Sequence, residues 1–169
     1  MSSREPVPAF VALGANLGDP VAALARATAA VARLPQTRLV ACSSLYLSAP
    51  VDAGGPDYFN AVIEISTALT APHLLQLLQK IEQEAGRERP WPNAPRTLDL
   101  DLLLFGHASL DGPHLTVPHP RMLQRAFVLL PLAEIAPSWA QAAQAPGMAE
   151  QRIERIADPR WMPALAKPN

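Results

Sequence analysis

Cysteine, aromatic residues and excess charge are all scarce in this chain of 169 residues. Cys42 is the only cysteine, which excludes an intrachain disulfide framework and a zinc site built from cysteines. With 14 basic and 15 acidic residues the net charge is −1, so no overall charge attracts nucleic acid or an anionic membrane. No uncharged apolar run is long enough to cross a bilayer, and the N-terminus lacks a signal-peptide pattern. We therefore expect a monomeric cytoplasmic protein that binds neither nucleic acid nor membrane.

The composition that remains is typical of a globular protein. Hydrophobic residues make up 49 % of the chain and charged residues 17 %, so the chain has enough apolar surface to form a core. The length predicts one domain over residues 1–169. Cys42 lies in an apolar stretch and is interpreted as a buried structural thiol.

The order of the expected elements predicts the fold class. Periodicity and turn signals indicate a strand at 9–13, a helix at 20–34, strands at 37–51 and 58–69, a helix at 73–86 and a strand at 97–106. This is an α+β, ferredoxin-like βαββαβ sandwich, in which two helices pack on one face of an antiparallel sheet. A C-terminal extension of strands and helices follows, in which "AQAAQAPG" at 140–147 is interpreted as a linker.

Two aspartates interrupt the leucine-rich stretch "RTLDLDLLLF" at 96–105. Side chains alternate along a strand, so Asp99 and Asp101 are expected on one face, within about 7 Å of each other. A solvated sheet face would tolerate the pair. A divalent cation such as Mg²⁺, which binds carboxylate oxygens, would remove their mutual repulsion. The pair alone leaves these two interpretations about equally weighted, although aspartate is disfavoured in strands.

The surroundings of this strand favour the metal interpretation. Two cationic groups flank it: Arg87, Arg89 and Arg96 before it, and His119, Arg121 and Arg125 after it. Guanidinium groups bind phosphate oxygens in a two-point manner. Carboxylates that hold a metal, with arginines on either side, are the groups needed for phosphoryl transfer from a nucleotide.

Two further residues could bind a heterocycle. Tyr58 and Asn60 are two residues apart at the start of a predicted strand, so a flat ring and an amide share one face. In isolation, a core tyrosine and a turn asparagine are the favoured interpretation of these two residues. Phe127 follows the second cationic group and is by default a core residue.

Several motifs together resemble the 6-hydroxymethyl-7,8-dihydropterin pyrophosphokinase family. They are "VALGANLGD", "SSLYLSAPV", "PDYFNAVIEI", "KIEQEAGRER", "PRTLDLDLLLFG" and "LTVPHPRMLQRAFVLLPLAEIAP". The resemblance covers residues 10–137 in collinear order and leaves 138–169 as a C-terminal tail. It implies that the β,γ-diphosphate of ATP is transferred to the hydroxymethyl group of the pterin, with release of AMP, in folate biosynthesis.

The resemblance also implies roles for particular residues. Two Mg²⁺ ions would be held by Asp99 and Asp101, with Arg89 and Arg96 completing the catalytic set. The implied pterin-binding residues are Ser48, Ala49, Val51, Tyr58, Asn60, Asp99 and Phe127. The implied ATP-binding residues are Gln79, Glu82, Arg87, Arg89, Arg96, Leu102, Leu115, Thr116, His119 and Arg125.

Two alternatives remain on the sequence alone. A ferredoxin-like fold also serves non-enzymatic modules that bind RNA or small ligands. Against an RNA-binding module, the sequence lacks the aromatic signature of an RNA-binding sheet. Against a sensor of small ligands, such a module would not need an aspartate pair beside arginines. The other alternative is a magnesium-dependent nucleotide transferase that acts on a different alcohol.

Overall fold

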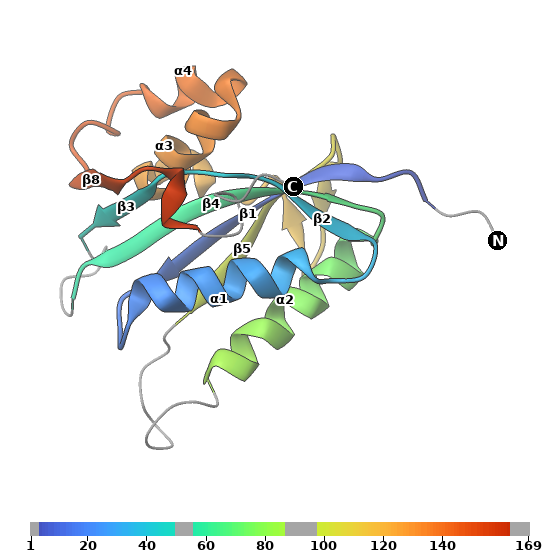
Figure 1. The fold of residues 1–169 in the computed structure, drawn as a ribbon. Helices are drawn as coiled ribbons and strands as arrows, with labels where there is room; N and C mark the ends of the chain where they lie inside the picture. Colours follow the sequence, from blue (N-terminus) through green and yellow to red (C-terminus); the bar gives the residue numbers. More distant parts are fainter. Residues whose placement is uncertain (1–3, 50–55, 87–97, 163–169) are drawn as a thin grey trace.

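The computed structural model describes residues 4–49, 56–86 and 98–162 (Figure 1). Its strands are β1 (Val7–Ala15), β2 (Thr37–Cys42), β3 (Leu45–Ser48), β4 (Tyr58–Thr67), β5 (Asp99–Phe105), β6 (Leu110–Asp111), β7 (Thr116–Val117) and β8 (Ile153–Ala157). Its helices are α1 (Pro20–Ala32), α2 (Ala71–Gly86), α3 (Ala126–Ile135) and α4 (Ala140–Ala143), with short 3₁₀ turns η1 (Met122–Gln124), η2 (Pro137–Trp139) and η3 (Pro159–Trp161). Within these ranges, no helix combines the length and apolarity that crossing a bilayer requires.

The main sheet has six strands in the order β5-β1-β4-β3-β8, with β2 also paired to β4. All of its pairings are antiparallel. Helices α1 and α2 cover one face, whereas α3 and α4 lie over part of the other (Figure 1). The predicted ferredoxin-like arrangement of strands and helices is therefore confirmed, with the C-terminal elements added to it.

A side chain caps the N-terminus of each of the helices α1 and α2. Asp19 accepts a hydrogen bond from the backbone N–H of Ala22 at 3.2 Å, and Pro20 occupies the first helical position. The Thr70 hydroxyl accepts from the backbone N–H of His73 at 3.3 Å and caps α2 in the same way. These two caps set the start of α1 at Pro20 and of α2 at Ala71.

The sheet separates two hydrophobic cores. Between the sheet and the helices α1 and α2, the fully buried residues include Leu24 and Leu78. On the opposite side, Leu129 and Leu132 of α3 pack against the sheet. Strand β4 serves both cores, since Val62 faces α3 while its neighbours face α1 and α2, as the alternation of the sequence predicts.

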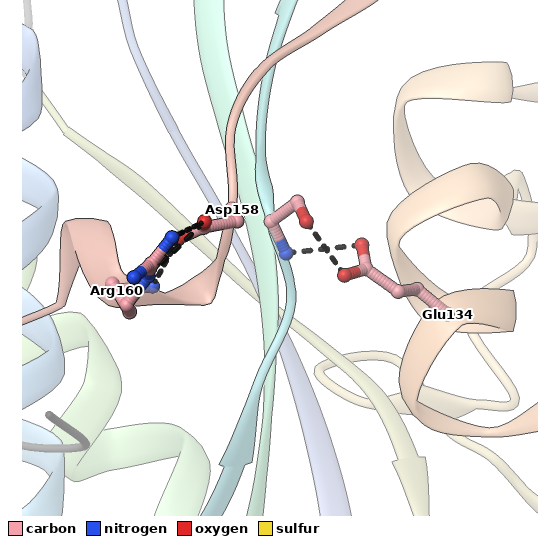
Figure 2. Close-up of polar contacts among 4 residues, drawn as sticks. Glu134, Asp158 and Arg160 are labelled. Carbon is pink, nitrogen blue, oxygen red and sulfur yellow. Dashed lines mark hydrogen bonds and ion pairs between the residues drawn. The ribbon is translucent and has the colours of Figure 1, made fainter.

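The stretch expected as one strand at 37–51 is two strands, so that prediction is wrong. Strand β2 ends at Cys42 and β3 begins at Leu45. Between them, the Ser43 hydroxyl accepts a hydrogen bond from Val62 N at 2.9 Å. Glu134 of α3 accepts two more, from Ser44 N at 3.0 Å and Ser44 Oγ at 2.6 Å (Figure 2). These side-chain contacts replace regular strand pairing and join the break to α3.

The linker interpretation of residues 140–147 is also wrong. This stretch contains α4, and both Ala143 and the following Met148 are buried against α3. The chain then forms β8 at the sheet edge beside β3. Trp161 in η3 donates from Nε1 to the carbonyl of Ser43 at 2.8 Å, which anchors the segment on the side of α1 and α2.

Candidate active site

Three residues form a row across β4, β1 and β5, at the end of the sheet where β4 and β5 begin. Asn60 of β4 pairs with Gly14 of β1, and Gly14 pairs with Asp99 of β5. Residues directly opposite each other in antiparallel strands share a face, so Asn60 and Asp99 stand roughly 10 Å apart with Gly14 between them. A Cβ at Gly14 would lie 3.5 Å from Asn60 Oδ1. The glycine therefore leaves a floor of bare backbone between the amide and the carboxylate.

The next row on the same face contains the second aspartate. Asp101 pairs with Ala12, which in turn pairs with Val62. The intervening Leu100 and the following Leu102 are buried on the opposite face, in the core under α1 and α2. The predicted placement of both aspartates on one face is confirmed. Asp99 is exposed and Asp101 half-buried.

A cavity of about 440 Å³ opens beside the aspartates, between β5, α2 and the loop that carries β6 and β7. Eight residues predicted for the site line it: Gln79, Glu82, Asp99, Asp101, Leu102, Leu115, Thr116 and His119. The segment Gly112–His114 lines it too, and the sequence analysis assigned it no role. One hollow thus brings together carboxylates, an imidazole and an amide from three elements far apart in the chain.

His119 is held at the border of this cavity by its backbone and its ring. His119 N donates to the carbonyl of Leu103 at 2.9 Å, and its Nδ1 accepts from Arg121 N at 3.2 Å. Burial lowers the pKa of His119 below its ordinary 6.5, the nearby Asp101 raises it in part, and Arg125 and Arg121 lower it. The imidazole is therefore neutral at pH 7, with its proton on Nε2, where it can donate one hydrogen bond.

Glu82 fixes the start of β5 relative to α2. Its Oε2 accepts a hydrogen bond from the backbone N–H of Leu100 at 2.9 Å. Leu100 lies between the two aspartates, so this contact helps to set their position. The ATP-binding role of Glu82 stays a prediction.

A second cavity, of about 520 Å³, lies between the end of β3, the start of α3 and the start of β8. Four predicted residues line it, namely Ser48, Ala49, Arg125 and Phe127. The Arg125 guanidinium carbon lies 5.4 Å from the centre of the Phe127 ring, a cation–π distance that ties the two side chains together.

Asn60 and Tyr58 line neither of these two cavities. Asn60 nevertheless connects its row with Gly14 and Asp99 to the second cavity, through Ser48. Its Nδ2 donates to Ser48 Oγ at 2.7 Å and to the carbonyl of Tyr58 at 3.1 Å. Asn60 is only 4 % exposed and lies within a strand, so its interpretation as a turn asparagine is wrong. Both amide hydrogens are used in these bonds, which leaves Oδ1 as the acceptor facing the row.

The sequence analysis missed Gln151, Arg152 and Ile153, which also line the second cavity. No local motif marks them, because their partners lie far away in the sequence: Gln151 bonds to residues 25 and 27 positions earlier. Four predicted residues, Val51, Arg87, Arg89 and Arg96, fall outside the residues that the structure describes.

The donor set fits a metal that is only partly coordinated by protein. Among the residues described, no group of three or more histidine, cysteine, aspartate and glutamate side chains could enclose an ion. Asp99 and Asp101 remain as a carboxylate pair at the cavity border. Magnesium commonly binds to one or two carboxylates and takes its other ligands from water and substrate phosphates, which matches this pair.

Comparison with known proteins decides the family. The sequence pattern of 7,8-dihydro-6-hydroxymethylpterin-pyrophosphokinase (HPPK) matches residues 10–137. The chain belongs to this family. The 2-amino-4-hydroxy-6-hydroxymethyldihydropteridine pyrophosphokinase of Pseudomonas aeruginosa is 52 % identical over 129 residues, 76 % of this chain and 80 % of that protein. The Haemophilus influenzae protein of the same name is 47 % identical over 131 residues, 77 % and 82 % of the two chains.

Two solved structures that resemble this HPPK family member are of larger proteins. An HPPK-DHPS structure in complex with substrates has a TM-score of 0.64 at 13 % identity, over 83 % of this chain and 43 % of its own. A Plasmodium falciparum HPPK-DHPS triple mutant has a TM-score of 0.68 at 11 % identity, over 85 % and 44 %. This chain spans less than half the length of those chains. At such low identity the likeness shows the fold.

Proposed function

We propose that this chain transfers the diphosphate of ATP to the hydroxymethyl group of 6-hydroxymethyl-7,8-dihydropterin, a step of folate biosynthesis. The observation that carries the proposal is the juxtaposition on one sheet face of a buried amide, a bare glycine floor and two carboxylates, in a chain of the HPPK family. The amide suits the edge of a heterocycle, and the carboxylates suit a metal-bound triphosphate.

The pterin is proposed to lie over Gly14, between Asn60 and Asp99. The free Oδ1 of Asn60 would accept from an N–H of the pterin, and Asp99 would accept from another on the opposite edge. Tyr58 and Phe127 are proposed to enclose the flat ring, since aromatic faces bind heterocycles by stacking. Backbone groups at Ser48, Ala49 and Val51 would complete this subsite.

ATP is proposed to occupy the 440 Å³ cavity, whose wall carries Asp101, Leu115, Thr116 and His119. Asp99 and Asp101 would hold Mg²⁺, two ions by the family resemblance. When bound, Mg²⁺ neutralises phosphate charge and lowers the pKa of a coordinated hydroxyl. The remaining members of the proposed ATP subsite are Gln79, Glu82, Arg87, Arg89, Arg96, Leu102 and Arg125.

In the proposed step, the hydroxymethyl oxygen forms a bond to the β-phosphorus of ATP while the bond from that phosphorus to the α-phosphate oxygen breaks. AMP departs with the electron pair of the broken bond, and the hydroxyl proton is released to solvent. The residues orient the two substrates in line and distribute charge, so no side chain needs to become covalently modified. Arg125, just before α3, and the arginines before β5 would stabilise the charge on the phosphates.

We also propose that residues 1–169 act as one domain, in a monomeric cytoplasmic enzyme. The pairing of β8 with β3 supports the first point, because it places the C-terminal segment in the main sheet. Use of ATP favours the cytoplasm. Light scattering of the purified chain would test the proposed monomeric state. A measured mass of twice 18.1 kDa or more would show that the chain is not a monomer.

The product nucleotide tests the proposed function. ATP labelled in its β-phosphate is incubated with the protein, Mg²⁺ and either hydroxymethyldihydropterin or a panel of other alcohols. We expect AMP to form and the label to move to the pterin, only when pterin and Mg²⁺ are both present. Formation of ADP, or transfer to another alcohol in preference to the pterin, would show that the activity is a different nucleotide-dependent transfer.

A further inference from the structure

We propose that Gln151, which lies beyond the family-matched residues 10–137, is a positioning residue for both substrates. The inference rests on the proposed function, because it assigns Gln151 the task of holding Arg125 and Phe127 in place. It comes from one short piece of chain, Gln151 and Arg152, that contacts both walls of the 520 Å³ cavity.

The first wall is the start of α3. Arg125 precedes this helix but makes no capping hydrogen bond with its side chain, so the first N–H groups of the helix need another acceptor. Gln151 Oε1 accepts from Ala126 N at 2.9 Å, and Gln151 Nε2 donates to the carbonyl of Gln124 at 2.9 Å. One side-chain amide therefore joins the end of η1 to the beginning of α3 across the residue that carries the Arg125 guanidinium.

The second wall is the end of β3. The carbonyl of Arg152 accepts a hydrogen bond from Ala49 N at 3.4 Å, and Ile153 pairs with Ser48. Gln151 is thus attached through its own backbone to the strand end where the pterin subsite is proposed. The side chain sets the position of α3, and the backbone sets the position of β3.

This arrangement fixes the separation of the two walls. Arg125 and Phe127 stand on either side of the capped Ala126, and the cation–π contact between them makes them move together. Release of the cap would let the first turn of α3 fray, because helix ends without a hydrogen-bond partner are the least stable part of a helix. Both side chains would then lose their orientation toward the substrates.

A purely structural role for Gln151 makes a different prediction. If Gln151 only stabilised the fold, its replacement would lower the melting temperature and leave the kinetic constants of the folded enzyme unchanged. If it positions Arg125 and Phe127, the KM values rise while the enzyme stays folded. The division of the effect between KM and kcat therefore separates the two roles.

The test uses three variants of the full chain. Gln151→Leu removes every side-chain hydrogen bond of Gln151 at similar size, including the longer contacts of Nε2 with the carbonyl of Gly147 and with Met148 Sδ. Gln151→Glu keeps an oxygen for Ala126 N and loses the Nε2 donor. Gln144→Leu is the matched control, since Gln144 is exposed and its side chain makes no hydrogen bond with any described residue. Each variant is assayed with varied pterin and with varied ATP.

We expect Gln151→Leu to raise the KM for the pterin about tenfold, with a smaller rise for ATP and kcat within about threefold of the unmodified enzyme. Gln151→Glu should recover most of the KM effect, and Gln144→Leu should match the unmodified enzyme. Unchanged KM values in Gln151→Leu would overturn the inference, as would equal impairment in Gln151→Leu and Gln151→Glu.

Amide hydrogen exchange tests the same contact without any substrate. The N–H of Ala126 should exchange at least about tenfold faster in Gln151→Leu than in Gln151→Glu or in Gln144→Leu. Equal exchange in all three would overturn the inference. Absence of diphosphate transfer by the unmodified chain would instead overturn the proposed function, while the exchange rates would still report on the cap.

Discussion

The two faces of the main sheet differ in what they leave open. One face is closed by α1 and α2 over a continuous apolar core that contains Leu24, Leu78 and Ile63. The other is covered by α3 and α4 over only part of its area (Figure 1). Asp99 and Asp101 of β5 lie on this second face, at the border of a cavity. The closed face therefore mainly supplies stability, whereas the open face carries the two carboxylates of the proposed chemistry, in a cavity that Gln79 and Glu82 of α2 also line.

The same strands serve both faces, so the division follows the alternation of side chains. In β5, Leu100 and Leu102 point into the closed core, whereas Asp99 and Asp101 point to the open side. Two buried leucines therefore hold a strand that exposes two mutually repelling carboxylates. Substitutions on the open face should affect turnover and those on the closed face should affect unfolding.

The largest effect is expected on the open face. Asp101→Ala should lower turnover at saturating Mg²⁺ by at least about a thousandfold, because a metal ligand is lost. The circular dichroism spectrum and the melting temperature should change little, since Asp101 is half-buried and is a member of neither hydrophobic core. Glu84→Ala, which removes an exposed carboxylate of α2, is the control and should retain full turnover. Near-normal activity of Asp101→Ala would remove the metal role of this residue.

The next effect belongs to the closed face. Leu24→Ala empties a fully buried position under α1 and should lower the free energy of unfolding by about 2–5 kcal/mol in urea titrations. The turnover of the folded variant, measured well below its melting temperature, should stay close to that of the unmodified enzyme. Val40→Ala, at a site 39 % exposed, should change unfolding by only about 0.5 kcal/mol. A loss of turnover in folded Leu24→Ala would mean that the two faces are not separable.

Glu134 connects α3 of the open face to the strand break between β2 and β3, so its effect is expected to be intermediate. Glu134→Ala removes the acceptor of the Ser44 bonds and of the Tyr46 hydroxyl at 2.9 Å. The free energy of unfolding should fall by about 2 kcal/mol. Glu150→Ala, at an exposed carboxylate that makes no hydrogen bond or ion pair with any described residue, should leave the free energy of unfolding unchanged. Equal stability of the two variants would contradict this role.

The same contact predicts a pH dependence. Burial, and then the hydrogen bond and charge of Glu134, raise the pKa of Tyr46 above its ordinary 10.0. The folded state therefore keeps the phenol proton when the unfolded state loses it, so this contribution to stability is present below pH 10 and declines above it. Urea titrations between pH 9 and pH 11 should show a smaller decline for Glu134→Ala than for the unmodified protein.

The smallest effect is expected at an exposed ion pair after β8. Arg160 Nη2 lies 2.7 Å from Asp158 Oδ2 (Figure 2), and hydrogen bonds from Arg160 lower the pKa of Asp158 to about 2. Any stability from this pair is present above the ordinary pKa of 3.8 and is lost as the pH falls through about 2. Because both groups are solvated, Asp158→Asn should leave the melting temperature at pH 7 unchanged. A clear drop would show that the pair supports the neighbouring Trp161 anchor.

Local patterns predicted the parts of the fold that depend on local physics. The start of α1 at Pro20, the strand that begins at Tyr58 and the shared face of Asp99 and Asp101 all follow from short sequence signals. The break at Ser43 was missed because the side chains that replace strand pairing come from Glu134, which is 90 residues from Ser44.

The candidate site divides in the same way. The residues of the first cavity could be named from motifs, although their meeting depends on the packing of α2 against β5. Gln151 could not be predicted, because its side chain bonds to the backbone of Gln124 and Ala126. Nearly every residue has the same backbone groups, so no sequence motif marks these partners.

The most direct test of the account is the location of the metal. Crystals grown with Mn²⁺ and a non-hydrolysable ATP analogue would reveal the ion by its anomalous scattering. We predict anomalous density in contact with the carboxylates of both Asp99 and Asp101, bridged to the phosphates in the adjoining cavity. Density that contacts neither aspartate, with the analogue bound elsewhere, would contradict the division of the sheet into a stabilising face and a chemical one.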